Sequence, residues 1–124
     1  MHPEIPLGAS VISIIWESHC SDSDYPEIKI LNPFSGDRQA YLEEIDKYLG
    51  KIDSIDIIAV SAGFDSYEKE VGKKLKRFDY YLIGRMLKKF SKKLCYGRRF
   101  AILEGGYHPE HLGKNVLAFY QGFE

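Results

Sequence analysis

The sequence has little cysteine, no long apolar run and almost no net charge. Cys20 and Cys95 are the only cysteines in 124 residues, which excludes a disulfide scaffold and favours reduced thiols in a cytoplasmic protein. No apolar stretch approaches the roughly 18–20 residues that span a bilayer, and the first residues lack the basic segment of a secretion signal. The 17 basic and 18 acidic residues give a formal net charge of −1. A general affinity for nucleic acid is therefore not expected, although a local basic patch stays open.

Short apolar runs alternate with amphipathic segments along the chain. Hydrophobic residues make up 44% of the sequence, enough for one packed core, and we expect a single α/β domain over residues 1–124. The run Asp56–Phe64 is apolar without alternation, which is typical of a strand covered on both faces of a parallel sheet. Phe100–Leu103 reads as another buried strand. The remaining expected strands are 11–16 and 28–31, and the expected helices are 37–49, 79–95 and a last one from 109 onward.

Residues suited to the start of a helix stand at the beginning of each expected helix. Asp37 and Asp79 can cap the first two helices, and Pro109 suits the first position of the last one. The apolar spacing of the last helix predicts an inner side formed by Leu112, Val116, Leu117 and Tyr120.

Residues 56–104 form a strand–helix–strand unit, so their two strands are expected to lie parallel with a right-handed crossover. Both strands then end at the same edge of the sheet, where open α/β sheets bind ligands. Asp65 leaves the first strand at this edge, and Tyr107 leaves the second. Structural roles are the alternative: the aspartate caps a turn, and the tyrosine packs on the rim. Gly63, Gly105 and Gly106 either adopt positive φ or let the backbone approach a ligand closely.

Two motifs at this edge resemble those of a known family. Ser61–Asp65 (SAGFD), followed about forty residues later by Leu103–Tyr107 (LEGGY), closely resembles the carboxyl-terminal part of the histone deacetylase superfamily. That superfamily includes acetylpolyamine amidohydrolases and acetoin-utilisation proteins. Asn32–Asp37 is similar to its proline- and glycine-rich turn, residues 70–72 stand where a second turn is usual, and residues 111–122 match the helix after the tyrosine. The resemblance covers about residues 28–124, and residues 1–27 are divergent.

The resemblance implies a fold and a chemistry. The fold is the carboxyl-terminal half of the arginase/deacetylase fold, a three-layer, open, mostly parallel sheet with helices on both faces. The chemistry is zinc-dependent removal of acetyl groups from acetyl-lysine or acetylpolyamines. Asp65 matches the family's third zinc ligand, and Tyr107 matches the tyrosine whose hydroxyl polarises the amide carbonyl. Gly63, Phe64, Gly105 and Gly106 would form part of the acyl pocket.

Other parts of the family's site have no match in the sequence. The two further zinc ligands lie in an Asp-x-His motif and the general base in a His-His pair, and neither motif occurs here. His108 stands where the family often has asparagine. Glu17-Ser18-His19 has the spacing of a carboxylate-x-histidine pair and follows an expected strand, so Glu17 and His19 are candidate substitute ligands beside Asp65. The alternative is a polar loop without metal.

Three functions therefore stay open: a deacetylase-class amidohydrolase inactive without further residues, a non-catalytic binding or structural module, and a minimal metalloenzyme using Glu17, His19 and Asp65. Half of a parallel sheet exposes an edge that invites pairing with another chain. We therefore expect a homo-oligomer or a complementary subunit as partner, and an acetylated amine as substrate in the catalytic case.

Overall fold

The structure is a computed structural model that describes residues 11–14, 28–31, 37–70 and 73–124. The described strands form one four-stranded sheet in the order β2-β1-β3-β4, and every neighbouring pair is parallel. The expected parallel pairing of the strands within 56–104 is thus confirmed. The strands are β1 (Val11–Ile14), β2 (Ile28–Leu31), β3 (Ile57–Ala62) and β4 (Arg99–Leu103).

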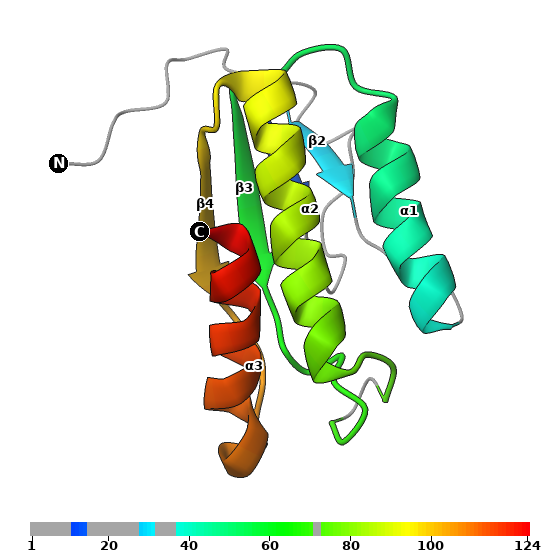
Figure 1. The fold of residues 1–124 in the computed structure, drawn as a ribbon, viewed down its shortest axis with the longest axis vertical. Helices are drawn as coiled ribbons and strands as arrows, with labels where there is room; N and C mark the ends of the chain where they lie inside the picture. Colours follow the sequence, from blue (N-terminus) through cyan, green and yellow to red (C-terminus); the bar gives the residue numbers. More distant parts are fainter. Residues whose placement is uncertain (1–10, 15–27, 32–36, 71–72) are drawn as a thin grey trace, which may run out of the picture.

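Three helices pack on one face of this sheet: α1 (Arg38–Gly50), α2 (Arg77–Cys95) and α3 (Pro109–Phe123). Tyr41 of α1, Ile83 of α2 and Phe119 of α3 meet Val60 and Ala62 of β3 around one small cavity, and Figure 1 shows the helices side by side in front of the strands. The α/β open sheet is as expected. The expected helices on both faces are not found among the described residues.

The direction of the chain across the sheet explains this one-sided arrangement. From β2 through α1 to β3, and from β3 through α2 to β4, the chain moves the same way across the order β2-β1-β3-β4. Crossovers of the same hand that move in the same direction place their helices on the same face. In β3, accordingly, Ile58, Val60 and Ala62 are buried under the helices while the alternating residues are half-buried. Among the described residues, helices therefore cover only one face of this strand.

The prediction of a buried β4 is wrong. Phe100, Ile102 and Leu103 are 38%, 55% and 57% exposed. Within the described residues β4 pairs with β3 alone, so it is an edge strand, and α3 packs mainly on α2 rather than over β4. The core instead lies between β3 and the helices; Leu49, Ile58 and Leu87 are completely buried in it. Cys95 is a free, buried thiol whose pKa is raised, chiefly by burial.

The helix starts agree with the sequence in two of three cases. Asp37 caps α1, where its side chain accepts the Ala40 N–H at 2.8 Å, and Pro109 opens α3. In α2 the cap is Lys76, and Asp79 lies three residues inside the helix, where its carboxylate accepts the Lys76 N–H at 2.7 Å. The expectation that Asp79 is the cap is therefore wrong by three residues.

The predicted inner side of α3 is also partly wrong. Leu117 and Tyr120 are 53% and 55% exposed, while Asn115 and Phe119 are buried. The helix is turned so that Gly122 can lie against the backbone of α2. The buried side of the helix thus combines the Phe119 side chain with a close contact between two backbones at Gly122.

Candidate active site at the carboxyl ends of β3 and β4

The two sequence motifs meet where β3 and β4 end. The paired register places Ala62 opposite Leu103, and the hydrogen bonds continue beyond the strands. Glu104 donates its N–H to the Ala62 carbonyl at 3.0 Å, and the Phe64 N–H donates to the Gly105 carbonyl at 2.8 Å. The SAGFD and LEGGY segments are therefore bonded backbone to backbone at one edge of the sheet.

Asp65 lies directly against the glycine turn of the second motif. A Cβ built on Gly105 would stand 3.1 Å from the Asp65 Cγ and from both of its carboxylate oxygens. The Oδ1 atom is buried, although the residue as a whole is half-buried. Gly105 thus leaves the space that the carboxylate occupies, as expected for a glycine that permits close approach.

Gly106 has the other property expected of these glycines. Its φ is +128°, in a region that residues with a side chain rarely adopt. A Cβ there would also stand 2.6 Å from the Leu112 Cδ1 and 3.0 Å from the Phe64 Cβ. Gly63, in contrast, is not among the residues with positive φ.

Replacing Gly106 with alanine is expected to lower the free energy of unfolding by about 2–3 kcal/mol, because it adds backbone strain to a steric conflict. Urea unfolding followed by circular dichroism measures the difference. Gly50→Ala is the matched control, because nothing lies within 4 Å of a Cβ at Gly50 and its φ is not positive. Equal stability of the two variants would contradict the assigned backbone conformation.

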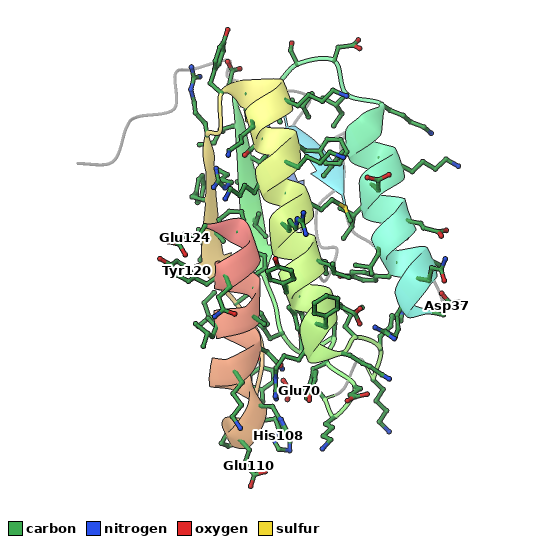
Figure 2. All side chains as sticks on the ribbon, viewed as in Figure 1. Asp37, Glu70, His108, Glu110, Tyr120 and Glu124 are labelled. Atoms are coloured by element: carbon green, nitrogen blue, oxygen red, sulfur yellow. The ribbon has the colours of Figure 1, made fainter. Side chains whose placement is uncertain are left out.

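Tyr107 is exposed to solvent. Its side chain is 74% exposed, so it does not pack on the rim. Its backbone is fixed by Glu70, whose Oε2 and Oε1 accept the Tyr107 N–H at 2.7 Å and 3.0 Å. Glu70 lies near the start of α3 in Figure 2. The turn is therefore anchored while the phenol faces solvent.

The Phe64 side chain is 2% exposed and belongs to the core. Its ring contacts those of Tyr80 and Phe119. A cavity of about 40 Å³ lies beside it, lined also by Gly63 and Ser66. The Tyr80 hydroxyl forms hydrogen bonds with Ser66 Oγ at 2.7 Å and with the Phe64 carbonyl at 3.3 Å, and burial is the main cause of its raised pKa.

A group of polar side chains that the sequence analysis did not single out lies directly after Tyr107. His108, Glu110 and His111 have ligand atoms within 4.8 Å of one another, and they are the only such group of three found in the described part of the chain. Figure 2 shows His108 and Glu110 at the tip of α3. In the sequence, the two histidines are three residues apart at a helix start, which places them on the same face. This spacing could have identified the group.

Arg77 limits what this histidine group can bind. Its Nη2 lies 2.8 Å from the His111 Nδ1. Because a guanidinium only donates, Nδ1 accepts and the remaining proton of a neutral ring is on Nε2. Burial, followed by His108, Lys69 and Arg77, lowers the pKa of His111, which favours that neutral form. The His111 ring therefore presents a donor, not a metal-binding lone pair, at Nε2.

Glu17 and His19, the substitute ligands, lie outside the described residues. The strand before them is described: β1 pairs in parallel with β3, with Ile14 opposite Val60. The chain consequently leaves β1 at the same edge of the sheet at which Asp65 leaves β3. This adjacency is what the substitute-ligand hypothesis requires of the fold.

Comparison with known proteins identifies the family to which the chain belongs. The histone deacetylase domain family matches residues 28–123, so the chain belongs to the histone deacetylase family. Type-2 histone deacetylase 2 of Dictyostelium discoideum is 43% identical over 56 residues, which are 44% of this chain and 3% of that protein. The chloroplastic histone deacetylase 14 of Arabidopsis thaliana is 38% identical over 63 residues, which are 49% of this chain and 15% of that protein.

The fold is shared with a solved deacetylase. The structure of the histone deacetylase Clr3 matches with a TM-score of 0.72 and 18% identity over 97% of this chain and 28% of that one. The chain thus spans a small part of each relative. Within the described residues no helix is long and apolar enough to cross a membrane.

Proposed function

We propose that this chain contributes the Asp65 carboxylate and the Tyr107 hydroxyl to a deacetylase-class site that hydrolyses acetylated amines. The observation that supports this most is the backbone pairing of the two motifs, which brings the Asp65 carboxylate against the Gly105 backbone two residues before Tyr107. Acetyl-lysine and acetylpolyamines are the substrate class that the family resemblance implies.

Asp65 fits zinc, because a carboxylate oxygen beside a turn without a Cβ is a suitable ligand for that ion. When bound, zinc would supply Lewis acidity to the scissile carbonyl. Tyr107 would donate its hydroxyl proton in a hydrogen bond to the carbonyl oxygen as negative charge develops there. In the described structure the hydroxyl is free to turn toward such a substrate, because the side chain is mostly exposed while its backbone is held by Glu70.

The site is incomplete in the described residues, because a general base and two further ligands lack matches. We therefore propose that the chain alone is inactive and acts with a second polypeptide that carries the His-His and Asp-x-His motifs. The adjacency of β1 and β3 favours one second candidate, in which Glu17 and His19 complete a metal site with Asp65. A cytoplasmic location is proposed from the sparse cysteines.

The purified chain is expected to hydrolyse an acetylated lysine peptide no faster than buffer containing zinc. Addition of a separately produced deacetylase segment that carries His-His and Asp-x-His should restore turnover. Asp65→Ala should abolish the restored activity, and Tyr107→Phe should reduce it by about 10²–10³-fold. Turnover by the chain alone that disappears in both His19→Ala and Asp65→Ala, together with zinc retained after dialysis, would instead favour the second candidate.

We also propose that β4 is a contact edge for a second copy or for the complementary subunit. Phe100, Ile102 and Leu103 are exposed on this edge strand, and such edges recruit further strands. Light scattering coupled to size exclusion is expected to show a dimer or larger species at micromolar concentration, and Ile102→Lys should shift it toward monomer. A monodisperse wild-type monomer would contradict self-association and leave the second polypeptide as the candidate.

A further inference from the structure

The outer side of α2 is strongly basic. The helix carries six basic residues and one acidic residue, and that acidic residue, Asp79, is already paired with Arg38. Five of the basic side chains line a groove of about 1040 Å³ that α1, α2 and α3 form together. They are Arg85, Lys88, Lys89, Lys92 and Lys93.

These five cations have no ion-pair partner among the described residues, where Arg38–Asp79 is the ion pair found. Their spacing brings like charges together: Arg85 and Lys89, Lys88 and Lys92, and Lys89 and Lys93 are each four residues apart on one helix. Such pairs destabilise a helix. The groove has Asp46 as its sole acidic lining residue, so the fold holds a concentrated positive charge that it does not itself neutralise.

Part of the groove lining is apolar. Leu42 of α1 and Leu82 and Met86 of α2 line it, and each is half-buried. A surface between helices that combines apolar and charged side chains is the kind of surface that receives an amphipathic helix. From Arg85 to Lys93 the cations extend over about 12 Å of helix, which corresponds to roughly two turns of a partner helix.

We propose that this groove binds an acidic, amphipathic helical segment of a partner protein. Apolar side chains of that segment would cover Leu42, Leu82 and Met86, and its carboxylates would pair with the lysines along α2. A single-stranded nucleic acid is disfavoured, because Tyr81 is the single aromatic residue lining the groove and single strands bind by stacking on several.

Fluorescence anisotropy with a labelled 18-residue model helix of leucine and glutamate, the leucines forming one stripe, tests the proposal on the full chain. Binding is expected, and raising salt from 50 to 200 mM should weaken it. Lys88→Glu with Lys92→Glu should weaken binding at least tenfold. Lys69→Glu with Lys114→Glu, which changes the net charge equally outside the groove, should leave affinity unchanged. Lys88→Gln with Lys92→Gln provides a second variant that relieves the repulsion within α2.

Several results would overturn the proposal. One is equal loss of affinity in both charge-reversed pairs, which would mean that net charge alone acts. Others are equal binding of an isomeric peptide whose leucines are spread around the helix, or binding of oligothymidine or phosphatidylserine vesicles in place of the peptide. A change of oligomeric state in the Lys88 and Lys92 variants without peptide would assign the groove to a second copy of this chain.

Discussion

Replacing Gly122 with alanine is expected to lower the free energy of unfolding by about 3 kcal/mol. A Cβ at this position would overlap the Tyr81 carbonyl oxygen and stand 2.7 Å from the Arg85 backbone nitrogen. Backbone atoms within a helix cannot move aside as a flexible side chain can, so α2 and α3 would have to separate. Gly84 makes the reciprocal contact, where a Cβ would overlap the Phe119 carbonyl oxygen. Urea unfolding of Gly122→Ala and of Gly84→Ala measures the loss of unfolding free energy.

Gly113→Ala is the matched control on the same helix. Nothing lies within 4 Å of a Cβ at Gly113, so alanine there should raise stability by about 0.5–1 kcal/mol through its helix propensity. The same chemical change on α3 is therefore expected to have opposite signs at two positions. Destabilisation of similar size at both would mean that propensity or the unfolded state, and not the helix contact, is responsible.

Asp79→Ala is expected to cost about 2–3 kcal/mol, because it removes hydrogen bonds to a charged group. Its carboxylate is completely buried and accepts hydrogen bonds from Arg38 Nε and Nη2, each at 2.8 Å, and from the Lys76 N–H at 2.7 Å. Alanine would leave the first turn of α2 without this acceptor and would separate α1 from α2 at this end. Thermal and urea unfolding, measured on the same samples, give the loss.

Asp37→Ala provides the comparison, because Asp37 also accepts a backbone N–H at a helix start but is exposed. Its loss should cost about 1 kcal/mol, the usual value for an exposed cap. Arg38→Ala should cost more than Asp37→Ala, because it leaves the buried Asp79 carboxylate without its cation. If Asp79→Ala and Asp37→Ala cost the same, burial of the Asp79 ion pair would have no measurable weight.

Chain connectivity is the property that the sequence predicts best. Two apolar runs with one helix between them normally form parallel strands, and that arrangement places Asp65 and the Gly105-Gly106 turn at one edge. The glycines after the strands predict either a positive φ or a close approach of the backbone to another group. The absence of a Cβ has few other uses at that position. The family resemblance then supplies a chemical interpretation that periodicity cannot give.

The burial of individual elements was less predictable. An apolar run such as Phe100–Leu103 reads the same in the centre or at the edge of a sheet, because its position depends on strands elsewhere in the chain. The orientation of α3 depends on Gly122, which carries no periodic signal of its own. His111 and Arg77 are 34 residues apart in sequence, so their contact, and the tautomer that it selects, required the fold.

The two hydrogen bonds between the motif segments also bear on motion at the rim. Phe64 and Glu104 each donate an amide across the ends of β3 and β4, so the carboxylate of Asp65 and the glycine turn share one rigid unit. Amides held in this way exchange with solvent only when the surrounding sheet opens. Any fast rearrangement that accompanies a substrate would then be limited to rotation of the Tyr107 side chain. The Asp65 carboxylate is thus held in place by the sheet, whereas the Tyr107 side chain rotates within nanoseconds.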